Sequence, residues 1–395
     1  MPGTHPVLTP FLVLWLLALF AAAPATQAGN QVVAWGAGKT INPSDYNDFG
    51  QSIIPAGLTN AVMVAGGWRH SLAVKADGTI QGWGDDSLGQ TDFPATNNYV
   101  AVACGDLHSV ALRSDGTVVA AGDDYYGQLN VPAGLTNIVA ISCGYYHTLA
   151  LKADGTLAAW GGQGSVNYGE GNVPAGISNV VAIAAGGYHN LILKADGTLF
   201  AWGENDYGET NIPAGLSSVV AIAAGGAHNL ALRADGNVIA WGANTDGETN
   251  VPSGLSNVVA IAAGASHSLA LTSNGTVVAW GAGTGSDATV DYGQNIVPAN
   301  LTNVIQIAAG DLHSLALVGS APPVMRARSI RPGLATNGFH FWLPTRNGRV
   351  YQLEYKSSLA TNIWQALPLR AGNGGDLQLN DPAIDSQRFY RVNQW

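Results

Sequence analysis

Seven histidines recur in one setting and are the first candidates for chemistry. Each has a glycine three residues before it, and successive histidines lie 38 to 46 residues apart. An imidazole can bind a metal or accept a proton. However, a residue that recurs in every repeat is expected to have the same structural role in each. Separate repeats also hold these rings too far apart for several to reach one metal ion at about 2.0–2.1 Å. The histidines are His70, His108, His147, His189, His228, His267 and His313.

We therefore expect each histidine to form a hydrogen bond that fixes the turn beside it. Serine or threonine follows several of them, but covalent catalysis needs one activated nucleophile rather than several equivalent ones. Two acidic loops, 45–48 and 287–291, lack the Asp-x-Asp-x-Asp-Gly spacing of a calcium loop, and calcium binding there stays open. The sequence predicts no catalytic residue, no metal site and no cofactor, so we do not expect an enzyme.

Acidic and aromatic side chains form the second group, because they occupy positions at which the repeats differ. They stand just before a repeat histidine or just after the position of a repeat tryptophan. Carboxylates beside Trp and Tyr suit a cationic protein partner, since opposite charge speeds association and aromatic rings anchor it. In the alternative interpretation they are solvated turn residues that maintain solubility. The predicted partner-binding residues are Trp68, Arg69, Asp85, Asp86, Asp106, Asp123, Asp124, Tyr125, Tyr145, Tyr146, Tyr188 and Asp206.

A period near 40 residues is the length of one propeller blade, and the local pattern indicates strands. Residues 180–185 are a short, continuous apolar run, as in a strand buried on both faces. The Asp196-Gly197 pair is a hairpin signal, because such turns need a positive φ. A third strand ends at Trp202, and a fourth ends at Pro213, where an outermost strand tolerates proline. The repeated unit therefore predicts blades of four strands.

The two ends of the repeat region predict a closed ring. Residues 32–36 begin at a third strand, and residues 305–318 supply only the first two strands of a last repeat. Pairing them would complete one blade and remove exposed sheet edges. We predict an all-β, seven-bladed propeller at 29–318, closed by N- and C-terminal strands that share one blade. A linker (319–325) and a small β-sandwich (326–395) follow, because strand-like runs there are separated by Gly and Asn-Gly signals.

Loop length distinguishes the two ends of the blades. From the tryptophan position to the glycine of the Tyr-Gly-Gln-like motif there are 6 residues in four blades. There are 9 after Trp160, 13 after Trp280 and 15 after Trp35. When a scaffold keeps most of its connections constant and varies one set of loops, those loops are expected to form the functional surface. We therefore expect protein binding at this variable face. The alternative is a carbohydrate-binding or enzymatic propeller that uses the long loops after Trp35 and Trp280.

The unit Ala-Ala-Gly-Gly-Tyr-His-Asn-Leu, followed by Lys-Ala-Asp-Gly-Thr and Ala-Trp-Gly-Glu-Asn-Asp-Tyr-Gly-Glu, resembles the regulator of chromosome condensation repeat. The resemblance covers about residues 31–318 and implies a seven-bladed propeller without fixing its function. The Val-Pro-Ala linker and the split last blade are most similar to secreted bacterial propellers that inhibit β-lactamases. Eukaryotic members, by resemblance, act as exchange factors on a small GTPase at chromatin. The C-terminal segment is similar to small modules of bacterial exported proteins.

Charge argues against nucleic-acid binding, which needs clustered Lys and Arg. Residues 29–320 contain 7 basic and 22 acidic residues, and residues 321–395 contain 9 basic and 4 acidic residues, so the chain has a net charge of −10. This opposite charge permits docking of the C-terminal segment on the propeller. Two cysteines exclude a disulfide scaffold and a four-thiolate zinc site. We expect Cys104 and Cys143 to be free thiols.

The N-terminal segment is typical of a signal peptide. An apolar run at 11–23 precedes Thr26-Gln27-Ala28, which predicts cleavage after Ala28 and a signal peptide over 1–28. Thirteen apolar residues are too few to span a bilayer, and a buried or anchoring helix is the alternative. We expect a secreted, periplasmic or cell-surface monomer with no transmembrane segment. Its expected function is non-enzymatic binding of a cationic protein, with enzyme inhibition as a special case.

Overall fold

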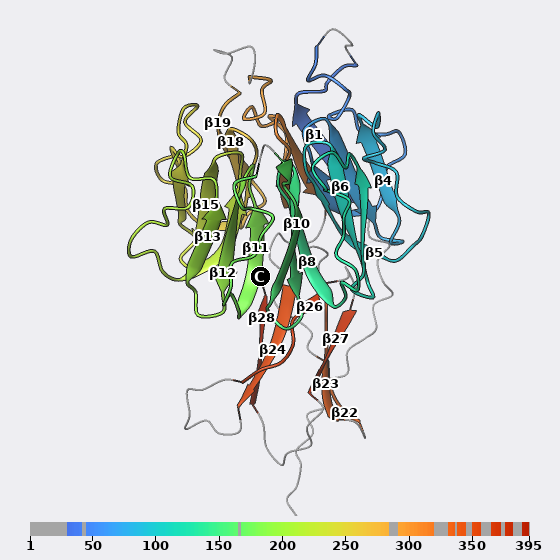
Figure 1. Cartoon of the computed structure of the whole chain (residues 1–395), viewed down its shortest axis with the longest axis vertical. Helices are drawn as coiled ribbons and strands as arrows, with labels where there is room; N and C mark the ends of the chain where they lie inside the picture. The colour runs from blue at the N-terminus through green and yellow to red at the C-terminus, as the bar shows by residue number, and fades with distance from the viewer. Residues whose placement is uncertain are drawn as a thin grey trace, which may run out of the picture.

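The computed structural model describes residues 30–41, 45–164, 167–283, 291–319, 331–335, 338–344, 350–356, 365–372, 376–381 and 389–394. Seven three-stranded antiparallel sheets repeat along residues 31–318 as the blades of a propeller (Figure 1). The predicted all-β, seven-bladed architecture is confirmed. The described residues contain no helix that is long and apolar enough to cross a membrane. The predicted signal peptide and most of the predicted linker lie outside the described residues.

Each blade has an inner, a middle and an outer strand. The inner strands are β2 (Ala61–Gly66), β5 (Tyr99–Cys104), β8 (Ile138–Cys143), β11 (Val180–Ala185), β14 (Val219–Ala224), β17 (Val258–Ala263) and β20 (Val304–Ala309). The middle strands are β3 (His70–Lys75), β6 (His108–Arg113), β9 (His147–Lys152), β12 (His189–Lys194), β15 (His228–Arg233), β18 (His267–Thr272) and β21 (His313–Val318). The outer strands are β4 (Ile80–Gly84), β7 (Val118–Gly122), β10 (Leu157–Gly161), β13 (Leu199–Gly203), β16 (Val238–Gly242), β19 (Val277–Gly281) and β1 (Gln31–Gly36).

The predicted fourth strand of each blade is wrong. After β7, the chain makes consecutive tight turns, in which Gly127 N donates to Asp124 O and Asn130 N donates to Gly127 O. These backbone groups are therefore satisfied locally instead of by a neighbouring strand. Pro132 follows and has no N–H to contribute to a ladder. The segment packs along the blade as an irregular outer edge.

The seventh sheet contains strands from both ends of the repeat region. Strand β1 pairs antiparallel with β21, in a register that runs from Gln31 opposite Val318 to Gly36 opposite His313. Strand β20 pairs with the other side of β21. The order β20–β21–β1 is the inner, middle and outer order of every other blade.

Seven glycines, each three residues before a repeat histidine, set how closely the blades approach. A Cβ atom on Gly186 would lie 2.7 Å from the Gly225 carbonyl oxygen of the next blade and 2.3 Å from Cε1 of His189. The equivalent glycine in each of the other blades meets its neighbour in the same way, at 2.2 to 2.5 Å from a carbonyl oxygen. No real Cβ fits such distances, so only glycine allows this spacing. The seven are Gly67, Gly105, Gly144, Gly186, Gly225, Gly264 and Gly310.

The repeat histidines link each blade to the next. Each Nε2 lies 2.7 to 3.2 Å from the hydroxyl or amide oxygen of the residue that follows the histidine in the next blade. The expected bond to the adjacent turn is wrong, because the turn closes through its own backbone, where Gly67 N donates to His70 O. The pairs are His70–Ser109, His108–Thr148, His147–Asn190, His189–Asn229, His228–Ser268, His267–Ser314 and His313–Ser71.

The surrounding network assigns the histidine tautomer. Ser71 Oγ donates its proton to Gln51 O at 3.0 Å, so it accepts from Nε2–H of His313 at 2.8 Å. Trp83 Nε1 donates to the same Gln51 oxygen at 2.8 Å. The tryptophans at positions 35, 160, 241 and 280 donate in the same way to the outer segment of the preceding blade, whereas Trp202 Nε1 has no partner among the described residues and Ala121 replaces the tryptophan in one blade. The side chains of all seven histidines are fully buried.

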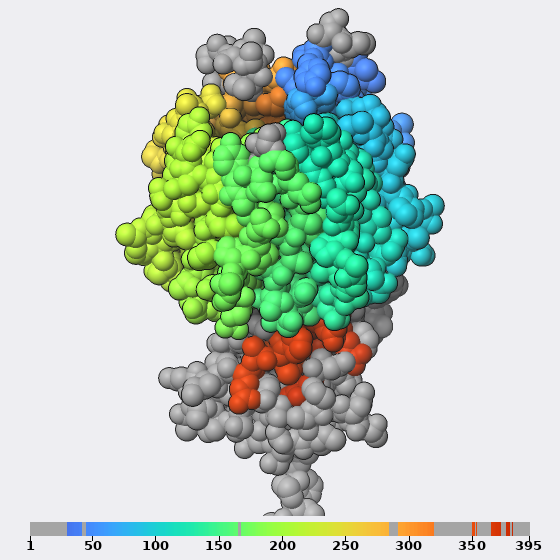
Figure 2. Space-filling model, viewed as in Figure 1, coloured from blue at the N-terminus to red at the C-terminus, as the bar shows by residue number. Residues whose placement is uncertain are grey.

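The C-terminal region forms two small sheets beyond the propeller face that carries the Asp-Gly turns (Figures 1 and 2). One sheet has the order β22–β23–β27, and in the other β24 pairs with β25, β26 and β28. The strands are β22 (Arg331–Ala335), β23 (Gly338–Pro344), β24 (Val350–Lys356), β25 (Gln365–Ala366), β26 (Arg370–Ala371), β27 (Asp376–Asp381) and β28 (Phe389–Gln394).

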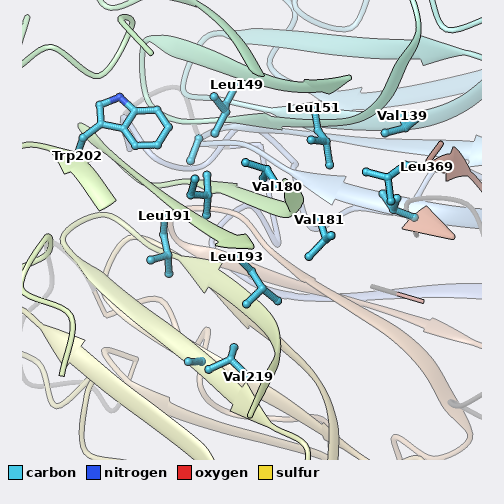
Figure 3. Packing of buried hydrophobic residues seen from close by; sticks show 14 of the residues in the cluster. Val139, Leu149, Leu151, Val180, Val181, Leu191, Leu193, Trp202, Val219 and Leu369 are labelled. Atoms are coloured by element: carbon cyan, nitrogen blue, oxygen red, sulfur yellow. The ribbon is translucent and has the colours of Figure 1, made fainter. Parts of the chain in front are cut away.

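The contact between this region and the propeller is apolar and backbone-mediated. Leu369 is buried in one hydrophobic cluster with Val139, Leu151 and Val181 of the propeller (Figure 3). The Leu369 backbone N–H donates to Ala153 O at 2.9 Å. The two recorded ion pairs among described residues lie within single Asp-Gly turns of the propeller. Among the described residues, this contact lies on the face that carries the Asp-Gly turns, which we call the constant face, and not on the variable face.

Replacing one interblade glycine should destabilise the ring. We expect Gly186→Ala to cost at least about 2 kcal/mol of unfolding free energy, because the new Cβ overlaps both backbone and a buried ring. Gly176→Ala is the control. It has φ +84° but nothing within 4 Å of an added Cβ, so it should cost only about 1 kcal/mol of backbone strain. Chemical denaturation measures both, and equal losses would refute the close-approach argument.

Acid should destabilise the propeller in a defined window. Burial lowers the pKa of His108, His228, His267 and His313 from 6.5 to about 3. The unfolded chain therefore binds more protons than the folded one between about pH 6.5 and the lowered values. The contribution of these histidines to stability should be constant above this window and should fall steeply as the pH drops from 6.5 toward 4. Denaturant midpoints that stay unchanged from pH 7.5 to 4.5 would contradict this.

Candidate functional site

Six tyrosines from three blades form a continuous tyrosine patch on the variable face. Ring centroids lie 4.8 Å apart for Tyr125–Tyr126, 4.7 Å for Tyr126–Tyr146 and 5.4 Å for Tyr168–Tyr188. Tyr145 joins the set through Tyr188 at 5.4 Å, with perpendicular rings. Tyr125 is 82% exposed and Tyr168 is 49% exposed, so the patch presents rings to solvent. Edge-to-face packing fixes the rings before a partner arrives.

A carboxyl pair, Asp106 and Asp311, lies where the patch meets the propeller axis. Both residues occupy the same repeat position, directly after the interblade glycine, in the two blades that flank the first blade. Around the axis the turns are joined by backbone bonds, such as Asp106 N to Tyr145 O at 3.2 Å and Asp311 N to Gly67 O at 3.1 Å. Asp106 is only 6% exposed, and its Oδ1 has no hydrogen-bond partner in the described structure.

Burial governs the protonation of this pair. It raises the pKa of Asp106 well above its usual value, and repulsion from Asp311 and a hydrogen bond with it add to the shift. Burial also raises the pKa of Asp311, to about 6. Near neutral pH the pair therefore keeps one proton and carries about one negative charge. The neighbouring Tyr145 and Tyr146 hydroxyls stay protonated, because burial raises the pKa of each.

Small residues at the axis let Tyr145 reach across it. An added Cβ would lie 2.8 Å from Tyr145 Cε2 at Gly187 and 2.5 Å from Tyr145 Oη at Gly226. Beneath this ring, Tyr145 and Asp311 line an axial cavity of about 60 Å³ together with the ends of the inner strands. Cys104 and Cys143 line the same cavity as free thiols, as expected. Burial raises the pKa of Cys143 to about 12, so its sulfur is a weak nucleophile.

On the other side of the axis, Arg69 lies over aromatic rings. Its guanidinium carbon is 3.4 Å from the Tyr46 ring centroid and 3.6 Å from that of Trp68. Trp68 Nε1 donates to Asn47 Oδ1 at 3.0 Å, and Asn47 Nδ2 donates to Tyr292 Oη at 3.0 Å. The described parts of the two longest loops are thus in direct contact. These loops follow Trp35 and Trp280, and they come together because their blades are adjacent (Figure 1).

Several predicted site acids serve local turns. Asp85 is 6% exposed and accepts from Ser87 N, while Asp86 accepts from Thr91 N at 2.8 Å. Asp123 accepts from Gln128 Nε2, and Asp124 accepts from Leu129 N. Asp86, Asp124 and Asp206 are exposed, so their charge still faces solvent.

The structure unites Asp106, Tyr145, Tyr146 and Tyr188, and it stacks Arg69 against Trp68. Tyr125 joins this set only through Tyr126.

Sequence reasoning missed Asp311, Tyr126 and Tyr168 as site residues. The signal for Asp311 was present, since Gly-Asp-Leu-His-Ser occurs at 105–109 and again at 310–314. The two aspartates become neighbours only when the ring brings the last blade beside the first. Tyr168 lies in a longer segment after β10, whose path no repeat pattern predicts. Among the described residues, no three His, Cys, Asp or Glu side chains are placed to hold a metal ion.

Removing one buried carboxyl should stabilise the protein at alkaline pH. A carboxyl whose folded pKa is raised loses stability as the pH rises through that value, because ionisation is disfavoured in the folded state. Asp106→Asn should therefore equal the wild type in unfolding free energy near pH 4 and exceed it at pH 8. Denaturant titrations at both pH values measure this. The quantity to compare is the unfolding free energy of Asp106→Asn minus that of the wild type. If this difference is smaller at pH 8 than at pH 4, the assignment is contradicted.

Comparison with known proteins identifies a family whose repeat matches this chain. A model of the regulator of chromosome condensation (RCC1) repeat matches residues 62–90, 99–128, 138–168, 180–209, 219–248 and 258–286. No curated protein sequence matches the chain significantly. Prp20p from Saccharomyces cerevisiae is 20% identical over 75% of this chain and 93% of its own, with a TM-score of 0.59. Human WBSCR16 is 21% identical over 74% of this chain and 99% of its own, with a TM-score of 0.55.

At these identities the two structures show likeness of fold alone. The six matched segments each include an inner strand, a repeat histidine and an outer strand of one blade. Together with the seven observed blades, they show that the chain belongs to the RCC1-repeat propeller family.

Proposed function

We propose that this protein is a non-enzymatic binding protein that takes a cationic protein partner on its variable face. The observation that carries the proposal is the tyrosine patch around the carboxyl pair. Exposed, rigid tyrosines are typical anchors of protein interfaces, and carboxylates at their centre and rim select positive charge. A propeller region with 7 basic and 22 acidic residues would also attract such a partner over distance.

The shape of the variable face supports binding over catalysis. The axial cavity of about 60 Å³ is far smaller than pockets that enclose small-molecule substrates, which hold about 300 Å³ or more. The surrounding tyrosines and aspartates form a broad surface, which suits a protein. Prp20p, a structural relative, is described with binding to Gsp1p and histones. Inhibition of an enzyme would be one form of such binding.

Export is part of the proposal. The apolar run at 11–23 and the small residues that precede position 29 support a secreted or cell-surface location. The C-terminal sheets contact the constant face through Leu369. A monomer held or tethered through that end would keep the variable face available to a partner.

The experiment is affinity capture from the extracellular proteome of the source organism with matched double variants of the full chain. Tyr125→Ser with Asp124→Asn changes one exposed ring and one exposed acid of the variable face. Phe200→Ser with Asp196→Asn makes the same changes away from it. In both acids the Asn oxygen keeps the acceptor of a turn bond.

We expect the first variant to retain at least tenfold less of a basic partner protein, since truncating a tyrosine that anchors an interface costs about 2 kcal/mol or more. The second variant should retain as much as the wild type. Equal retention by both variants would reject the variable face as the binding surface. Capture of glycans in place of protein would favour the long loops after Trp35 and Trp280.

A further inference from the structure

We propose that the carboxyl pair at the axis binds the ammonium group of a lysine side chain supplied by the protein partner. This inference rests on the proposed function and names the chemical group that the centre of the variable face recognises. It also assigns a role to Asp311, which the repeat pattern alone does not single out.

The pair has unused capacity to accept hydrogen bonds. Asp106 is 6% exposed, and its Oδ1 has no partner among the residues that the structure describes. The ion pairs of the described residues, Lys75–Asp77 and Arg233–Asp235, lie elsewhere, and the positive charge of Arg69 acts on Asp106 without forming an ion pair. A buried carboxylate without a full set of donors costs free energy, and that cost is recovered when a donor with positive charge arrives.

The available space favours ammonium over guanidinium. The cavity below Tyr145 and Asp311 is about 60 Å³, and its other walls are glycine, alanine and cysteine at the inner-strand ends. That is roughly the volume of two water molecules at about 30 Å³ each. Asp106 does not line this cavity but hydrogen-bonds to Asp311, which does. A lysine ammonium is compact and has three donors, enough for both carboxyls and one tyrosine oxygen. The planar guanidinium is larger and needs a fork-shaped acceptor.

Aromatic rings add to the attraction for a cation. Tyr145 spans the axis, and Tyr188 packs against it with ring centroids 5.4 Å apart and planes at 90°. This arrangement places one ring edge-on to the next at the border of the carboxyl pair. A desolvated ammonium near a ring face is attracted by the negative face of the ring.

Binding should exchange a proton for the ammonium. The pair shares one hydrogen bond, so ionising it sends one proton to solvent while the ammonium takes the position between the carboxyls. The charged and titratable groups near the pair are Arg69, Tyr145, Tyr146 and Tyr188, together with the Cys104 and Cys143 thiols of the cavity, whose pKa values burial raises. The three hydroxyls stay neutral below pH 9, because burial raises the pKa of each, so the pair itself sets the pH dependence. Affinity should rise as the pH increases through about 6, the pKa of Asp311.

The test is calorimetric titration of the full chain with n-butylammonium chloride, a model of the lysine side chain, at constant ionic strength. We expect saturable binding at pH 7.5, at least tenfold weaker binding at pH 5, and proton release that scales with buffer ionisation enthalpy. Methylguanidinium should bind at least tenfold more weakly. Asp311→Asn and, separately, Asp106→Asn should each reduce the affinity at least tenfold. Their melting temperatures check that both variants are folded.

Asp246→Asn is the matched control, because it removes one exposed charge from the same face away from the axis. It should leave butylammonium binding unchanged. Equal binding by wild type and Asp311→Asn, or equal affinity for both cations, would overturn the inference and indicate general charge attraction only. Such a result leaves the proposed function standing if the Tyr125 and Asp124 double variant still loses the partner. Conversely, a partner held equally by that variant rejects the proposed function even if butylammonium binds the pair.

Discussion

The approach of each interblade glycine to the carbonyl oxygen of the next blade is the constraint on which the structure depends. A distance of 2.2 to 2.7 Å from a virtual Cβ to that oxygen leaves no room for any side chain. The same approach brings the histidine ring against its glycine, with Nε2 aimed at a hydroxyl or amide of the adjacent blade. Glycine and histidine therefore recur together, because the glycine permits the close approach of two blades and the histidine forms the hydrogen bond between them. In a blade on its own, the histidine would lack its hydrogen-bond partner and the glycine would have no neighbouring blade to approach.

Ring geometry also explains how a monotonous scaffold produces a specific surface. The residue after each interblade glycine differs between most of the blades, and the seven such positions meet around one axis. They are Trp68, Asp106, Tyr145, Gly187, Gly226, Ala265 and Asp311. Backbone bonds between successive turns hold these positions in order. Side chains at one position can therefore reach over their neighbours wherever those are small, as Tyr145 does over Gly187 and Gly226. Differences in residue type at these seven positions therefore produce one site to which several blades contribute.

Periodicity predicts what every repeat shares, and this sets the limit of sequence reasoning here. The seven blades, the separation of a constant from a variable face and the burial of Trp83 and Trp160 follow from residues that recur. The missing fourth strand does not, because the turn around Gly127 satisfies its own backbone. The partner of each histidine was missed because it lies in another repeat. The Asp106–Asp311 pair was missed for the same reason, since 205 residues separate two positions that a ring makes neighbours.

The two halves of the axial region treat positive charge differently, and the contrast indicates what the variable face recognises. On one side Arg69 of the chain itself lies over Tyr46 and Trp68, with ring centroids 3.4 and 3.6 Å away. That aromatic cluster is already matched by an internal cation. On the other side the tyrosines surround Asp106 and Asp311, and no basic side chain of the described residues forms an ion pair with either. The charge of Arg69 also lowers the pKa of Asp106, but Arg69 forms no ion pair with it, so the carboxyl pair still lacks a directly bonded cation, which a partner can supply.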